Sequence, residues 1–123
     1  MPWDLKSDRP IYPQLIEQIE LMIFSGTYPP GSKLPSVRDM AQDAAVNPNT
    51  MQRALARLEE DGLINTHRTS GRSITEDVNM IKNSKSKLVE EQIREFLEKM
   101  QKMGFDQNEI LMSITSMVEG AKQ

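Results

Sequence analysis

The sequence has no cysteine and only one histidine in 123 residues. Without thiols, the chain has no disulfide framework, no cysteine nucleophile and no thiolate metal site, and a single imidazole argues against a histidine-based metal site. It also contains no Gly-rich phosphate loop, no GxSxG motif and no paired carboxylates on a recognisable scaffold. We therefore expect a protein that is not an enzyme and that uses no cofactor and no metal.

Long apolar runs are also lacking. No stretch approaches the roughly 18 apolar residues that span a bilayer, and residues 1–10 do not show the basic and then apolar pattern of a secretory signal. Hydrophobic residues make up 37% of the chain and charged residues 27%, proportions that are usual for globular domains. These features favour a cytoplasmic protein without a membrane partner, large enough for one small domain and an appendage.

The chain also lacks an excess of basic residues. The net charge of −3 weighs mildly against nucleic-acid binding, because many DNA-binding domains are clearly basic. Residues 32–75, however, carry six basic and five acidic residues, and the acidic ones fall mostly at the ends of predicted helices. A basic face on this acidic chain is therefore compatible with the sequence.

The stretch from residue 36 to residue 64 predicts two short helices joined by a tight turn. Ser36 is a suitable N-cap for a helix over residues 37–43, and Asn47 is a second N-cap that is followed by Pro48 at the first helical position. Four apolar residues define the inward face of the second helix: Met51, Ala54, Leu55 and Leu58. This arrangement predicts a helix-turn-helix.

The flanking segments complete a small domain. Apolar residues from Ile11 to Met22 recur with helical spacing, and Gly26 can end that helix in a left-handed conformation. After the helix-turn-helix, residues 63–65 and 73–75 are two short β-prone pieces on either side of a turn-like stretch, which predicts a hairpin, or wing. The expected fold is mainly α with a small β-wing, that is, a winged helix-turn-helix.

The chain changes character after residue 75, so we expect a winged domain over residues 1–75 and a two-helix tail over residues 76–123. The tail carries one apolar stripe on each helix: Val89, Ile93, Phe96, Met100 and Met103, then Ile110, Leu111, Ile114, Met117 and Val118. So short a tail cannot bury both stripes by itself. They must pack on the winged domain or on a second copy, and their heptad-like spacing favours a homodimer.

The outward face of the second helix carries Asn49, Thr50, Gln52 and Arg53. Asn and Gln can bond adenine through two hydrogen bonds, Thr can contact a phosphate or a thymine methyl, and Arg53 would meet the DNA backbone. A solvated surface is the plainer interpretation of the same residues. The nine methionines favour packing over an adaptable small-molecule site, so an effector is compatible with the sequence but not indicated.

The order of these motifs resembles the N-terminal domain of GntR-type bacterial transcription regulators. The resemblance rests on Pro10-Ile11-Tyr12, on residues 30–36 with Arg38, and on residues 58–64. The Asn47-Pro48-Asn49-Thr50 helix start and the short tail resemble the YtrA-type branch in particular. That branch implies homodimeric repressors without a large effector-binding domain, often of operons that encode ABC transporters.

The resemblance also implies the DNA contacts. They would be Arg38, Asn47, Asn49, Thr50 and Gln52 from the two helices, and His67, Arg68, Thr69, Ser70 and Gly71 from the wing. Three positions depart from the family pattern: Ala45 replaces the usual turn glycine, Pro48 replaces an arginine of some branches, and Thr69-Ser70-Gly71 replaces Gly-x-Gly.

We thus expect a homodimeric regulator that binds an inverted-repeat operator in double-stranded DNA, with half-sites about one helical turn or a multiple apart. Repression by promoter occlusion is the default mechanism, and an activator would have the same sequence features. The alternative function is a winged-helix module that contacts other proteins and no DNA. The acidic net charge and the altered wing favour that alternative slightly, whereas the intact recognition helix disfavours it.

Overall fold

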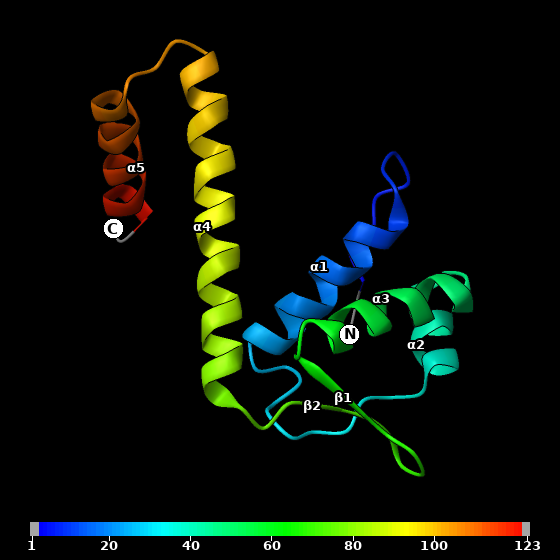
Figure 1. Ribbon diagram of the computed structural model, residues 1–123. Coiled ribbons are helices and arrows are strands. Elements are labelled where there is room, and N and C mark those ends of the chain that lie inside the picture. The colour runs from blue at the N-terminus through cyan, green and yellow to red at the C-terminus, as the bar shows by residue number, and fades with distance from the viewer. Residues whose placement is uncertain (1–2, 122–123) are drawn as a thin grey trace. The chain divides into compact units, whose positions relative to one another are not determined.

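The computed structural model describes residues 3–121, which contain five helices and one hairpin (Figure 1). The elements are α1 (Ile11–Phe24), α2 (Val37–Ala44), α3 (Pro48–Glu60), β1 (Ile64–His67), β2 (Gly71–Ile74), α4 (Val78–Lys102) and α5 (Gln107–Ala121). The chain divides into two compact units, one that ends at Ser84 and one that begins at Lys85. Mainly helical structure with a small β-wing confirms the expected fold class.

The core of the first unit lies between α1 and α3, with α2 packed on α3. Leu15 and Ile19 of α1 and Met51, Leu55 and Leu58 of α3 have no exposed surface. Helical spacing places these side chains on one face of each helix, so the two apolar faces meet when the helices cross. The inward face that the sequence predicted for α3 is confirmed, and the polar face of that helix therefore points outward.

Side-chain caps begin α2 and α3 where the sequence predicted them. The Ser36 hydroxyl accepts a hydrogen bond from the Asp39 N–H (3.1 Å), and the Asn47 Oδ1 accepts one from the Asn49 N–H (2.8 Å). Pro48 occupies the first position of α3. These caps satisfy N–H groups that the helices leave unpaired, and so they determine where each helix starts.

The turn between α2 and α3 depends on an alanine in a left-handed conformation. Ala45 has φ 57° and ψ 46°, and its N–H bonds back to the carbonyls of Ala41 and Gln42. It alone has a positive φ among the described non-glycine residues. The position thus has the geometry that glycine adopts without cost, whereas the alanine Cβ adds about 1–2 kcal/mol of strain.

The wing is an antiparallel hairpin whose base is tied to the segment before α2. β1 pairs with β2 from Ile64 opposite Ile74 to His67 opposite Gly71, so both strands extend nearer to the tip than the sequence predicted. The Leu34 N–H donates to the Arg72 carbonyl (2.9 Å) and the Ile74 N–H donates to the Ser32 carbonyl (2.8 Å). Strand β2 is therefore hydrogen-bonded to β1 on one edge and to residues 32–34 on the other. This pairing holds the wing at a defined place beside α2.

The second unit consists of most of α4 and of α5, which turns back beside α4 (Figure 1). A reciprocal capping box starts α5, because Asp106 accepts from the Glu109 N–H (2.9 Å) and Glu109 accepts from the Asp106 N–H (3.1 Å). Among the described residues, no helix is both long and apolar enough to cross a membrane.

Replacing Ala45 by glycine should stabilise the protein. Glycine removes the steric strain of the left-handed backbone, and Ala45 is exposed, so no packing is lost. We expect Ala45→Gly to raise the free energy of unfolding by about 1 kcal/mol in urea denaturation. Ala56→Gly, at an exposed site within α3, is the matched control and should lower it by about 1 kcal/mol. Equal losses in both variants would contradict the turn geometry.

Candidate nucleic-acid interface

The first two turns of α3 present a polar surface to solvent. Asn47, Asn49, Gln52 and Arg53 are exposed and Thr50 is half-buried, whereas the opposite face of the helix lies in the core. The N-terminus of a helix carries unpaired N–H groups and the positive end of the helix dipole, both of which favour a phosphate. The surface therefore combines amide donors and acceptors for base edges with an electrostatic preference for the DNA backbone.

Asn47 already has a structural role at this surface. Its Oδ1 caps α3 through the Asn49 N–H, and this leaves its amide nitrogen to donate to a ligand. Asn49 and Gln52 are exposed residues that also carry side-chain amides. The predicted contact residues of α3 are thus brought together on one exposed face.

Arg53 contacts an aromatic ring of α1. Its guanidinium carbon lies 4.4 Å from the centroid of the Tyr12 ring, within cation–π range. The charge stays at the surface while the ring restricts where the guanidinium can lie. Sequence reasoning placed Arg53 near the DNA backbone but missed Tyr12, because a contact between two helices leaves no periodic signal in either one.

Arg38 lies on the first turn of α2 and is exposed. The ion pairs of the described residues do not include it, so it does not pair with Asp39 or Asp43. Asp43 instead accepts a hydrogen bond from the Trp3 indole (3.2 Å). The positive charge of Arg38 therefore faces solvent without a neutralising carboxylate.

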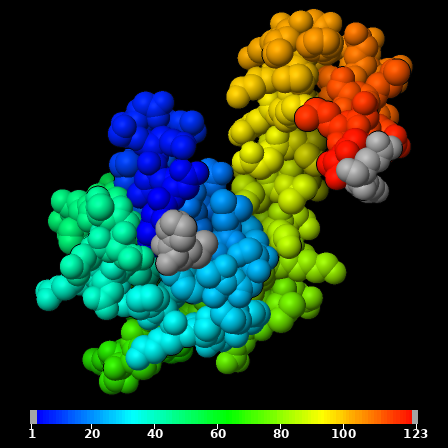
Figure 2. Space-filling model, turned by 180° about the vertical axis from the view of Figure 1, so that it is seen from behind, coloured from blue at the N-terminus to red at the C-terminus, as the bar shows by residue number. Residues whose placement is uncertain are grey.

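The wing tip projects from the first unit (Figure 2), and His67, Arg68, Thr69 and Ser70 are exposed along it. The His67 Nε2 lies 2.8 Å from the Ser73 hydroxyl on the facing strand, so the imidazole is held against the hairpin. Gly71 has φ +85°, a conformation that allows the tight turn at the tip. All five predicted wing residues, Gly71 included, thus stand at the surface, and the His67 ring is already oriented.

A hollow between the wing and the start of α2 brings together cationic groups that the sequence did not single out as a site. Lys33, Ser36 and Arg72 line it together with the wing residues Ser70 and Gly71. The Arg72 Nε is buried and has no hydrogen-bond partner. Lys33 was missed although it lies just before a capped helix, because the loop and the wing become neighbours only in the folded chain.

The predicted dimerisation residues lie in the second unit, and most of them are exposed. Their exposed fractions range from 40% to 76%: Val89, Ile93, Phe96, Met103, Leu111, Ile114 and Met117. Ile110 differs, because only 4% of it is exposed and it packs within one copy of the chain, and Met100 is half-buried. Val118 of the predicted stripe is exposed as well, and exposed Met112 enlarges the apolar surface beyond that stripe.

Comparison with known proteins places these features in a family. The family model described as bacterial regulatory proteins, gntR family, matches residues 11–74. The HTH-type transcriptional regulator YhcF of Bacillus subtilis is 37% identical over 115 residues, which cover 94% of this chain and 95% of YhcF. The HTH-type transcriptional repressor YtrA of the same organism is 37% identical over 95 residues, 76% of this chain and 73% of YtrA.

Two solved structures are similar to the chain. A GntR family transcriptional regulator from Listeria monocytogenes matches with a TM-score of 0.86 and 36% identity, over 91% of this chain and 98% of the other. The DNA-binding domain of AraR in complex with operator ORE1 matches with a TM-score of 0.52 and 26% identity, over 61% of this chain and 94% of the other. The first of these similarities extends into the second unit.

The two roles of Asn47 can be separated by substitution. Asn47→Asp keeps a side-chain oxygen that can cap α3, whereas Asn47→Ala removes it. We expect Asn47→Ala to lower the free energy of unfolding by about 1 kcal/mol, and Asn47→Asp to leave it within about 0.5 kcal/mol of wild type. Urea denaturation followed by circular dichroism measures both. If the aspartate variant is as unstable as the alanine variant, the cap is not what Asn47 contributes.

Proposed function

Because the chain belongs to the GntR family of bacterial transcription regulators, we propose that it is a homodimeric repressor that binds an inverted-repeat operator. The relatives with which it was compared are transcription regulators and not enzymes. The observation that carries the proposal is the capped, exposed polar face at the start of α3, which stands on a helix anchored in the core. The DNA-binding domain of AraR, which is similar over 61% of this chain, is known in complex with its operator.

In this proposal α3 enters the major groove and distinguishes bases. Asn49 and Gln52 form paired hydrogen bonds to base edges, and Thr50 contacts a phosphate or a thymine methyl. Arg38 and Arg53 neutralise phosphates on either side of the groove, because both are exposed cations next to this face. The exposed wing, from His67 to Gly71, contacts the backbone beside the groove.

The second unit supplies the dimer contact. The large apolar side chains of Ile93, Phe96 and Leu111 are exposed. A second copy of the chain covers them and brings two DNA-binding units together. A two-fold interface presents the same surface from both copies, so the two α3 helices face a two-fold symmetric operator. Occlusion of the promoter by the bound dimer then represses transcription, the activity for which YtrA of Bacillus subtilis is named.

The DNA-binding proposal is tested by fluorescence anisotropy with the DNA upstream of the chain's own gene and a scrambled fragment of the same composition. Affinity should fall across about 50–200 mM salt with a slope near −0.9 per neutralised phosphate. Gln52→Ala should lower the preference for the operator about tenfold, whereas Arg38→Ala should weaken binding to both fragments and reduce the salt slope by about 1.

Arg94→Ala is the control for Arg38→Ala, because it removes the same charge from an exposed position of the second unit. The Arg94→Ala variant should bind both DNA fragments with wild-type affinity. Wild-type binding no tighter to the upstream DNA than to scrambled DNA at every salt concentration would reject the proposal. The chain would then be a winged-helix module for protein contacts.

The dimer proposal is tested by a charge on the apolar surface of α4. Ile93→Glu places a carboxylate at the centre of the proposed interface, where it would be buried without a partner. We expect the dimer dissociation constant to rise at least about a hundredfold in sedimentation equilibrium. Gln92→Glu adds the same charge at the adjacent exposed position and should leave the dimer intact. An unchanged dimer in Ile93→Glu would place the interface elsewhere.

A further inference from the structure

The segment that precedes the family-matched region has no role in the function above. Residues 3–10, the strap, lie along α1 before that helix begins. The strap forms no helix or turn from Trp3 to Lys6, and its side chains alternate: Trp3 and Leu5 are half-buried against the core, whereas Asp4 and Lys6 are exposed and form an ion pair (3.1 Å). This alternation is that of a β-strand with one face on the core.

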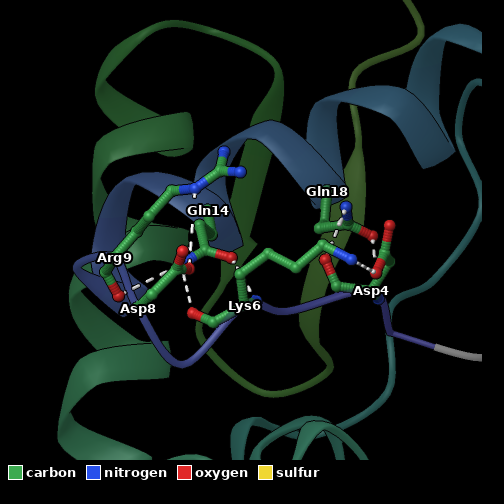
Figure 3. A network of polar contacts seen from close by, with 6 residues as sticks. All are labelled: Asp4, Lys6, Asp8, Arg9, Gln14 and Gln18. Atoms are coloured by element: carbon green, nitrogen blue, oxygen red, sulfur yellow. Dashed lines mark hydrogen bonds and ion pairs between the residues drawn. The ribbon is translucent and has the colours of Figure 1, made fainter.

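Two glutamines of α1 bind the strap through its backbone (Figure 3). The Gln14 Oε1 accepts from the Lys6 N–H (2.6 Å), and the Gln14 Nε2 lies 2.9 Å from the Lys6 carbonyl. Gln18 binds Asp4 in the same way, with Oε1 3.4 Å from its N–H and Nε2 3.3 Å from its carbonyl. Each side-chain amide thus serves as donor and acceptor to one residue, as a neighbouring strand would.

The spacing of the two glutamines matches the spacing of the strap. Four residues of an α-helix rise about 6 Å, and two residues of an extended segment span about 6.6 Å. Gln14 therefore lies beside Lys6 and Gln18 beside Asp4, because the strap runs antiparallel to α1. The Gln14 Nε2 also lies within 3.2 Å of the carbonyls of Arg9 and Pro10, so it closes the end of the strap on the start of α1.

The other face of the strap contacts the helix-turn-helix. The Trp3 indole N–H donates to the Asp43 carboxylate at the end of α2 (3.2 Å). Burial raises the pKa of Tyr28, and the negative charge of the same Asp43 carboxylate raises it further. Leu5 lines a cavity together with Ala45 of the turn and with Asn47 and Thr50 of α3.

We propose that Gln14, Gln18 and Trp3 are positioning residues of the DNA interface, acting through the strap. α1 and α2 each pack on α3, and the strap adds a direct link from α1 to the end of α2. The three helices are then connected pairwise around the strained Ala45 turn. This connection determines the angle at which α2 and the first turn of α3 face DNA. The inference rests on the proposed DNA-binding function and deepens it.

The double variant Gln14→Ala/Gln18→Ala tests the proposal in the full-length protein, with the upstream fragment and its scrambled counterpart as probes. Misorientation of α3 should cost about one base contact, so the ratio of operator to scrambled affinity should fall about tenfold. Scrambled-DNA affinity should stay within about twofold of wild type, because phosphate attraction does not depend on the angle of α3. Gln92→Ala, at an exposed site of α4, is the control.

The affinity ratio separates positioning from a general loss of folded protein, which would lower both affinities equally. If the double variant does not fold, Trp3→Phe decides the question, because it keeps an aromatic ring against the core and removes the N–H that bonds Asp43. A wild-type ratio in whichever variant is folded overturns the inference while leaving DNA binding intact. A wild-type protein without any preference for the upstream DNA overturns both.

Discussion

The burial of one face of α3 is the constraint on which the rest of the structure depends. Met51, Leu55 and Leu58 lie fully buried against α1, and this contact removes the helix from solvent on one side only. Rotating α3 to hide its polar face would expose three large apolar side chains, at about 1.5–3 kcal/mol each. The hydrophobic core therefore determines which polar side chains of α3 face solvent.

Weaker interactions around α2 and α3 determine the detailed positions of these two helices. The caps at Ser36 and Asn47 define where α2 and α3 begin, and the turn between them holds Ala45 in a left-handed conformation. Arg53 rests on Tyr12, and the strap ties α1 to α2. Each contact is small beside the burial of the core, but each acts on an angle or a position rather than on whether the domain folds.

The second unit shows the opposite balance. The capping box at Asp106 and Glu109 satisfies the start of α5, yet most of the large apolar side chains of this unit remain exposed in a single copy. Only Ile110 among the predicted interface residues is buried there. Helix formation is a local matter of propensity and caps, whereas burial of an apolar stripe requires a partner surface. This asymmetry supports a second copy as that partner.

The sequence by itself determined the helices, their caps, the hairpin and the polar face of α3, because period, capping residues and turn residues act over a few positions. The likeness to GntR regulators rested on the same local motifs. Only the tertiary structure decided the burial of Ile110, the contact of Arg53 with Tyr12, the hollow of Lys33 and Arg72, and the register of Gln14 and Gln18 with the strap. Those features join segments through space, and local periodicity carries no information about which distant surfaces meet.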